Sequence, residues 1–161
     1  MSGIRYTLPA SFTLANAGGD ADLMEITPAD DKPVRLVGLK ISQTSEVAEA
    51  QEEGLRIQIV RLPATVTSGS GGSAGTVGKT KRISGAASLT FEVNNTTLAT
   101  TSGTIEVLEE FGWNERGSPL EMWWDDDSQY DIKEGEVLLI RCQTTPADDL
   151  TLQITAIVDE G

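Results

Sequence analysis

The chain has 161 residues, of which 39% are hydrophobic and 23% are charged. That length lies within the usual range of one domain and can close one hydrophobic core, so we expect a single domain over residues 1–161. The formal net charge of −13 repels phosphate backbones and anionic lipids, which argues against nucleic acid or a membrane as a partner. The negative charge is compatible with a basic protein as a partner.

No apolar run is long enough to cross a bilayer, and the first residues lack the continuous apolar segment of a secretory signal. We therefore expect the chain to be made and to fold in a cytoplasm.

Histidine is absent from the chain. Its absence removes the Ser-His-Asp and Cys-His catalytic arrangements and histidine-ligated metal sites. The single cysteine, Cys142, cannot form an internal disulfide, and it is in phase with Leu138 and Ile140 in an apolar run. This phase predicts a small buried side chain rather than a nucleophile. We expect a protein that is not an enzyme and has no cofactor.

Alternating apolar and polar residues predict β-strands along most of the chain. In chain order the candidate strands are Tyr6–Leu8, Phe12–Leu14, Leu23–Ile26, Arg35–Ile41, Leu55–Ile59, Ser88–Val93, Thr104–Leu108, Leu120–Trp124 and Leu150–Ala156. A count of about eight to ten strands, with turn residues between most of them, predicts an all-β antiparallel sandwich or barrel. At most one short surface helix is expected, over Ser45–Glu53, because Ser45 suits a helix N-cap and Gly54 can end the helix.

The segment Thr67–Gly78 consists almost entirely of Gly, Ser, Ala and Thr, a composition that predicts a flexible loop. Lys79, Lys81 and Arg82 follow it and form the only dense basic run in an acidic chain. This run either is solvated or docks on an acidic partner.

The three tryptophans, Trp113, Trp123 and Trp124, fall within twelve residues of each other. In a strand, the side chains of Trp123 and Trp124 point to opposite faces, so only one of them enters the core. The other is a candidate for a protein interface, where tryptophan is enriched, or for a sugar-stacking platform. The candidate interface residues are Trp113, Trp123, Trp124, Lys79, Lys81 and Arg82.

The densest acidic cluster is Asp125–Asp127, followed by Asp131, Glu134 and Glu136. Oxygen ligands at this density suit Ca²⁺, but Gln129 and Tyr130 occupy positions where the EF-hand pattern requires an oxygen ligand and glycine. We therefore assign no metal ligand and expect a solvated loop, with a calcium site as the alternative.

Several predicted strands and turns form a recognisable pattern when they are taken together in chain order. It comprises Asp22–Ile26 with a Pro-Ala-Asp turn, Pro33–Gln43, Leu55–Ile59, the Thr-Ser-Gly-Ser-Gly-Gly loop, Asn94–Thr97, Gly135-Glu136 and a final hairpin ending Asp159–Gly161. Over nearly its whole length the chain resembles the jelly-roll capsid decoration (cement) proteins of tailed bacteriophages and prophages.

The resemblance implies a jelly-roll fold and a homotrimer that binds the major capsid protein on the outer surface of the virion, after synthesis in the host cytoplasm. It implies no catalytic residue. Two alternatives stay open. One is a carbohydrate- or receptor-binding module of a tail or head fibre, with Trp113 and the Asp125–Asp127 loop as its site; the other, ranked last, is a glycan-cleaving enzyme that uses carboxylates.

Overall fold

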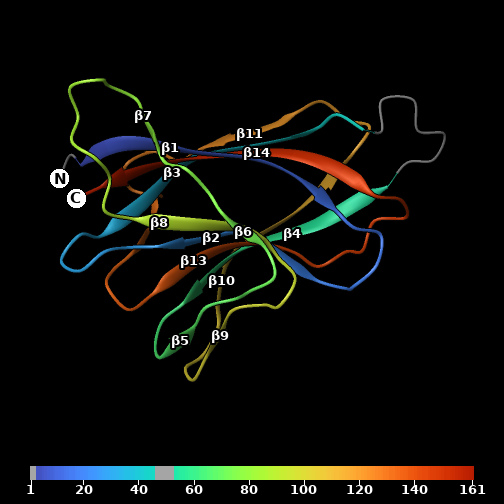
Figure 1. Cartoon of the computed structure of the whole chain (residues 1–161), viewed down its shortest axis with the longest axis horizontal. Helices are drawn as coiled ribbons and strands as arrows, with labels where there is room; N and C mark the ends of the chain where they lie inside the picture. Colours follow the sequence, from blue (N-terminus) through green and yellow to red (C-terminus); the bar gives the residue numbers. More distant parts are fainter. Residues whose placement is uncertain (1–2, 46–52) are drawn as a thin grey trace.

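The computed structural model describes residues 3–45 and 53–161, and every helix or strand within these ranges is a β-strand (Figure 1). The all-β antiparallel class predicted from the sequence is thereby confirmed. The helix predicted over Ser45–Glu53 falls on a segment that, except for its two end residues, lies outside the described residues.

The described ranges contain more strands than the sequence predicts, because several are only two residues long. They are β1 (Ile4–Leu14), β2 (Ala21–Thr27), β3 (Val34–Gln43), β4 (Gly54–Leu62), β5 (Val66–Thr67), β6 (Ser73–Ala74), β7 (Gly78–Lys79), β8 (Thr90–Asn95), β9 (Thr100–Thr101), β10 (Glu106–Asn114), β11 (Leu120–Trp123), β12 (Tyr130–Ile132), β13 (Val137–Cys142) and β14 (Leu150–Glu160).

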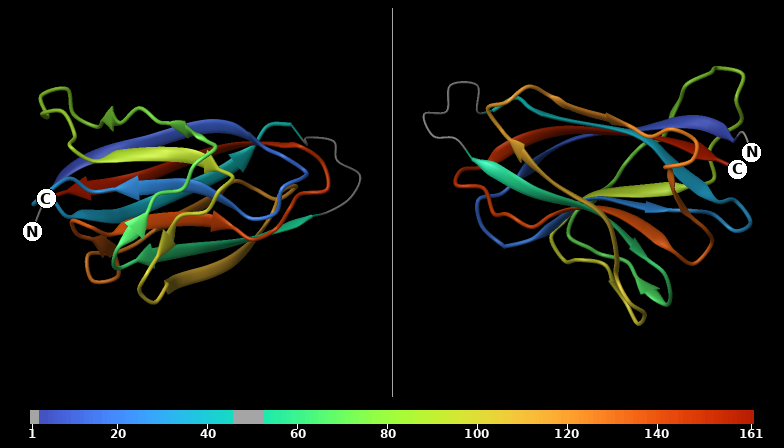
Figure 2. Two further views of the ribbon diagram at one scale, coloured as in Figure 1. Left: turned by 60° about the horizontal axis from the view of Figure 1, so that its bottom comes forward. Right: turned by 180° about the vertical axis from the view of Figure 1, so that it is seen from behind.

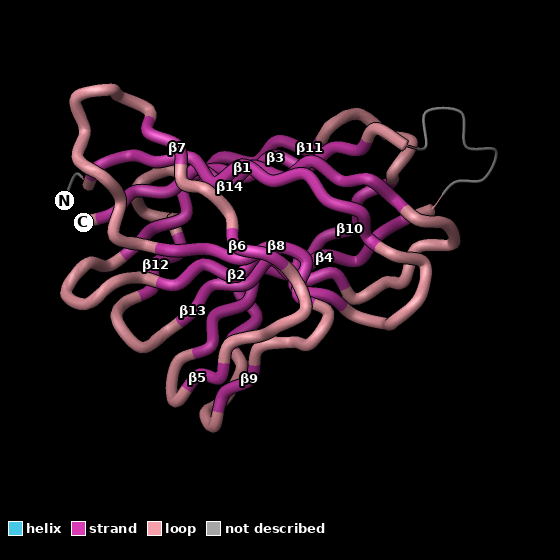
Figure 3. Tube along the Cα trace, viewed as in Figure 1, coloured by secondary structure: helices cyan, strands magenta, loops and turns pink. Residues whose placement is uncertain are grey.

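Two six-stranded sheets pack face to face (Figure 3). Sheet A has the order β11-β3-β14-β1-β7, with β12 also pairing with β3, and sheet B has the order β10-β4-β13-β2-β8-β6. The strand pairs of both sheets are antiparallel, and β5 and β9 form a separate two-stranded sheet. The fold is a β-sandwich.

Strand β14 is the central strand of sheet A. It pairs with β1 from Ile4↔Glu160 to Leu14↔Leu150, and its other side pairs with β3. Strand β1 therefore begins, and strand β14 ends, at the same end of the sandwich, where both termini lie (Figure 2).

The core lies between the sheets and follows the period of two residues that a strand imposes. In β14, Leu152, Ile154 and Ala156 point inward and are buried. Cys142 is also buried in this core, as its phase predicts, and its Sγ lies 3.3 Å from the Thr144 carbonyl oxygen. Burial raises the pKa of the Cys142 thiol, which keeps it in the unreactive protonated form.

The long connection between β4 and β10 covers part of the outer face of sheet B (Figure 2). The prediction of a flexible loop at Thr67–Gly78 is wrong, because β5, β6 and β7 pair there with β9, β8 and β1. Its glycines permit close packing: a Cβ on Gly72 would lie 2.0 Å from the Val93 carbonyl oxygen, and one on Gly75 would lie 2.2 Å from the Phe91 ring.

Buried polar side chains attach this connection to sheet B. Arg141 Nε donates to Asp22 Oδ1 at 2.7 Å, and both residues are buried. Asp22 Oδ2 accepts from the Ala99 amide at 3.0 Å, while Arg141 donates to the Ala99 carbonyl at 3.1 Å. Beside them, Glu25 accepts from the Gly69 amide at 2.9 Å, and burial raises the pKa of this carboxyl. The connection is therefore bound through its backbone at defined points.

We predict that Asp22→Ala lowers the free energy of unfolding by about 3–5 kcal/mol, because it leaves Arg141 as an unpaired buried charge and removes the acceptor of the Ala99 amide. Urea denaturation measures the change. The exposed Asp148 is the matched control, since Asp148→Ala is expected to change stability by less than about 0.5 kcal/mol. Equal stability of the two variants would show that the pair does not hold the connection.

A candidate protein-interaction surface at the end that holds both termini

One end of the sandwich carries β1's first residues, β14's last residues and a connection between the two sheets. We call residues 79–89 the basic loop; it begins with the last residue of β7 in sheet A and leads into β8 in sheet B. In Figure 1 it is the green loop near the two termini.

The basic loop presents the three cations that the sequence analysis identified. Lys79, Lys81 and Arg82 are exposed, and no ion pair joins them to another residue in the ranges 3–45 and 53–161. Ile83 follows directly and is 94% exposed, whereas the other exposed large hydrophobic residues of the described ranges reach at most 52%. An apolar side chain thus projects into solvent beside three positive charges.

Hydrogen bonds fix both ends of the basic loop to sheet A. Thr80 Oγ1 donates to the Arg5 carbonyl at 2.9 Å, and the Tyr6 hydroxyl donates to the Gly85 carbonyl at 3.0 Å. At its exit, the amides of Ser88 and Leu89 donate to the buried Glu160 carboxylate at 3.1 and 2.7 Å. The loop is therefore held in place before any partner arrives, which lowers the entropy cost of binding.

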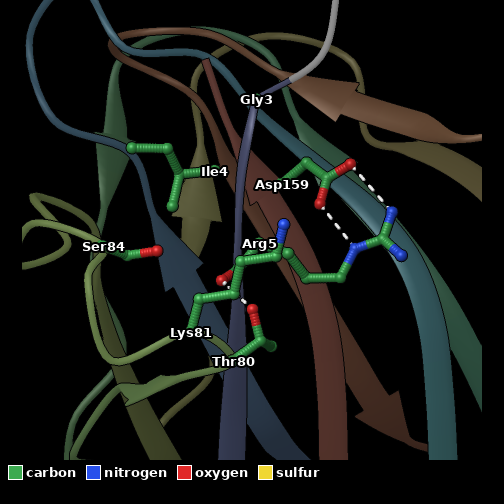
Figure 4. A pocket seen from close by; sticks show the side chains of 7 residues that line it. All are labelled: Gly3, Ile4, Arg5, Thr80, Lys81, Ser84 and Asp159. Carbon is green, nitrogen blue, oxygen red and sulfur yellow. Dashed lines mark hydrogen bonds and ion pairs between the residues drawn. The ribbon is translucent and has the colours of Figure 1, made fainter.

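A groove of about 510 Å³ lies between the basic loop and the start of β1. Figure 4 shows its lining residues, which are Gly3, Ile4, Arg5, Thr80, Lys81, Ser84 and Asp159. On one wall, Arg5 donates to both oxygens of Asp159 at 2.8 and 3.0 Å, and the hydrogen bond raises the pKa of Arg5. Since Asp159 already neutralises Arg5, Lys81 supplies the groove's uncompensated positive charge.

The structure does not bring the tryptophans together with the basic loop. Trp113 is 5% exposed and packs in the core, so it offers almost no surface to a partner. Trp124 is half-buried, with its ring centroid 5.7 Å from that of Tyr130. Trp123 is 52% exposed and lies on β11, at the opposite edge of sheet A from β7.

Trp123 occupies a defined position on the outer face of sheet A. Its ring lies over Gly38, where an added Cβ would be 2.7 Å from ring atom Cε3. Its Nε1 donates to Glu121 Oε1 at 2.6 Å, and Lys40 Nζ lies 5.7 Å from the ring centroid. The pair Trp123 and Trp124 thus divides between surface and interior, as strand geometry predicts.

The acidic segment Asp125–Asp127 forms an exposed turn between β11 and β12. Asp125 accepts from the Ser128 amide at 3.0 Å, and Asp126 accepts from Gln129 Nε2 at 3.3 Å. In the part of the chain that the structure describes, no three His, Cys, Asp or Glu side chains are arranged to hold a metal ion. Nor does any helix there have the length and hydrophobicity to cross a membrane.

No model of a known protein family, no curated protein and no solved structure matches the chain.

Sequence reasoning did not identify Ile83 and Glu160, two residues that shape this surface. Ile83 is one apolar residue in a polar segment, and periodicity cannot show whether such a residue turns inward or outward. The sequence feature that could have identified Ile83 is its position directly after the only dense basic run. Glu160 carries no local signal, because its partners lie 72 and 71 residues away.

We predict that Glu160→Ala increases trypsin cleavage after Lys81 and Arg82 by about tenfold to a hundredfold, because hydrogen bonds to a charged acceptor hold the loop's exit closed. Mass spectrometry of timed digests gives the rate. Asp148→Ala is the control. Both variants are digested under conditions in which their free energies of unfolding are equal. An unchanged rate would mean that Glu160 does not restrain the loop.

Proposed function

We propose that this chain is a non-enzymatic structural protein, a decoration or cement protein of a tailed-phage head. In this proposal a homotrimer binds the outer surface of the virion and stabilises it by bridging copies of the major capsid protein. The sequence resemblance supplies the phage context, and the structure contributes the two arguments that follow.

The strand order supports a jelly roll as the specific type of sandwich. Strands β1 to β4 alternate between the sheets, and four neighbouring strands of each six-stranded sheet form its main part: β1-β14-β3-β11 in sheet A and β2-β13-β4-β10 in sheet B. These eight strands, divided equally between two packed antiparallel sheets, match the eight-stranded double sheet of a jelly roll. Such a domain presents loops at its ends from a rigid body.

The observation that carries the proposal is the projecting Ile83 on a basic loop that hydrogen bonds hold to sheet A. Burying a solvated isoleucine releases hydration free energy, and the neighbouring cations select an acidic surface. Each such contact is small. A trimer on a lattice of repeated capsid subunits compensates for this, because its second and third contacts form at high effective concentration.

The test uses heads of the phage that encodes the chain, prepared without this gene. We expect the purified protein to sediment with these heads in a saturable amount and to raise their temperature of disruption. Ile83→Ser is expected to weaken binding at least tenfold, whereas Ile105→Ser, which alters another exposed apolar residue, leaves it unchanged. Absence of wild-type protein from the sedimented heads would refute the proposal.

A carbohydrate-binding module is the second candidate, and the exposed ring of Trp123 favours it. Trp113 cannot form a sugar site with the exposed Asp125–Asp127 turn, because Trp113 is buried. Trp123 instead presents a fixed aromatic ring with the Glu121 carboxylate and the Lys40 ammonium beside it. These groups combine stacking with hydrogen bonding, which suits a sugar.

A glycan array decides this second candidate. If the chain binds sugars, the wild-type protein and Ile105→Ser bind specific glycans on the array, whereas Trp123→Ala does not bind them. Trp123→Ala is expected to fold, because the ring it removes is 52% exposed. A wild-type array without signal, repeated with added Ca²⁺, would eliminate the candidate.

A further inference from the structure

Sheet B ends on one side in a long strand whose outer edge is free. Strand β10 pairs with β4, and no strand of the described ranges pairs with its other side. Between Glu106 and Trp113, the only group outside β4 that hydrogen-bonds its backbone in those ranges is the Tyr130 hydroxyl, 3.4 Å from the Leu108 carbonyl oxygen. The left view of Figure 2 shows β10 in gold at the margin of the sheet. Such an edge presents unpaired amides and carbonyls that another strand can bind.

Two exposed apolar side chains stand on one face of this edge. Ile105, directly before β10, is 47% exposed and Val107 is 49% exposed. Val107 lies opposite Val60, which belongs to the small apolar cluster on the outer face of sheet B. Ile105 shares this face, because it lies two positions from Val107. The pair extends the apolar cluster to the free edge, where side chains of an added strand would cover it.

The charges of β10 select what can pair with it. Residues 106–114 contain three carboxylates and no Lys or Arg. Arg61 pairs with Glu106 at 2.8 Å, whereas Glu109 and Glu110 have no ion-pair partner in the described ranges. A second copy of β10 is therefore a poor partner, since it would bring carboxylates against carboxylates. An extended segment that carries Lys or Arg is favoured.

A hollow of about 210 Å³ lies beside the same edge, and Arg56, Glu110, Gly112 and Gln143 are among its lining residues. A Cβ added to Gly112 would meet no atom within 4 Å. The glycine therefore does not accommodate a close neighbour within the chain, and the hollow has room for a side chain of a partner. Strand addition obtains its affinity from the backbone ladder and its specificity from such side-chain pockets.

We propose that the free edge of β10 binds an extended basic segment of another protein as an additional strand of sheet B. Apolar side chains of the segment lie beside Ile105 and Val107, and its basic side chains approach Glu109 and Glu110. The site is separate from the basic loop, which begins in β7 of sheet A. One copy can therefore hold this segment and dock on a second surface at the same time. This inference does not rest on the proposed function.

A synthetic eight-residue peptide of alternating lysine and valine, blocked at both ends and labelled with a fluorophore, tests the site. Fluorescence anisotropy with the whole protein is expected to show saturable binding. A peptide methylated on alternate amides keeps the charge but cannot form a ladder, and a peptide with glutamate for lysine reverses the charge. Both are expected to bind about tenfold more weakly or worse. Equal binding of the methylated peptide would overturn strand addition.

Variants of the protein locate the peptide. Gly112→Val fills the hollow, and valine suits a strand, so we expect unchanged or higher stability and peptide affinity about tenfold lower. Ile105→Ser/Val107→Ser is expected to weaken binding similarly, because it removes the apolar pair. Ile83→Ser, which alters an exposed isoleucine of the basic loop, is the matched control and is expected to bind like the wild type.

Three results would overturn the inference: no saturable binding to the wild type, equal binding to Gly112→Val, or wild-type dimers that Gly112→Val dissociates, which would give the edge to a second copy. Sedimentation with phage heads separates this inference from the proposed function. Protein that binds heads but not the lysine–valine peptide would refute only the β10 site. Protein that binds the peptide but not heads would refute only the proposed function.

Discussion

The buried ion pair between Asp22 and Arg141 is the interaction on which the arrangement of this fold most depends. Two charges withdrawn from water are costly unless they are paired and hydrogen-bonded, and here the backbone of Ala99 adds one donor and one acceptor to the pair. The connection between β4 and β10 must therefore lie on sheet B. Its position in turn places β7 on sheet A and β8 on sheet B, and so the basic loop spans the two sheets.

Strands with one buried face could be predicted from sequence, because alternation reports a half-buried strand directly. Strands β3, β4, β8 and β14 lie where the pattern predicts them. Strand β1 was predicted as two pieces on either side of Pro9. It is continuous because β7 pairs only with Tyr6 and Thr7, so the edge beside Pro9 requires no amide donor. Strand β10 was predicted too short, since its bulge between Val107 and Glu109 interrupts the alternation.

The candidate surface was only partly predictable, for a different reason. Charge is local, so the cations of the basic loop and the acids of the turn were visible in the sequence. Their placement on opposite edges of one sheet depends on strand order, which no local pattern encodes. Composition was misleading at Thr67–Gly78, because that segment is ordered by acceptors far along the chain, such as Glu25. Trp113 appeared to be a surface residue until its pairing with Leu55 placed it inward.

The position of Glu160 also has a consequence for the order of events during synthesis. Its carboxylate closes the exit of the basic loop, and its strand inserts between β1 and β3, which were made long before. On the ribosome, the nascent chain therefore cannot close the exit of the basic loop until β14 emerges. A chain that lacks β14 therefore also lacks the hydrogen bonds through which Glu160 closes this loop.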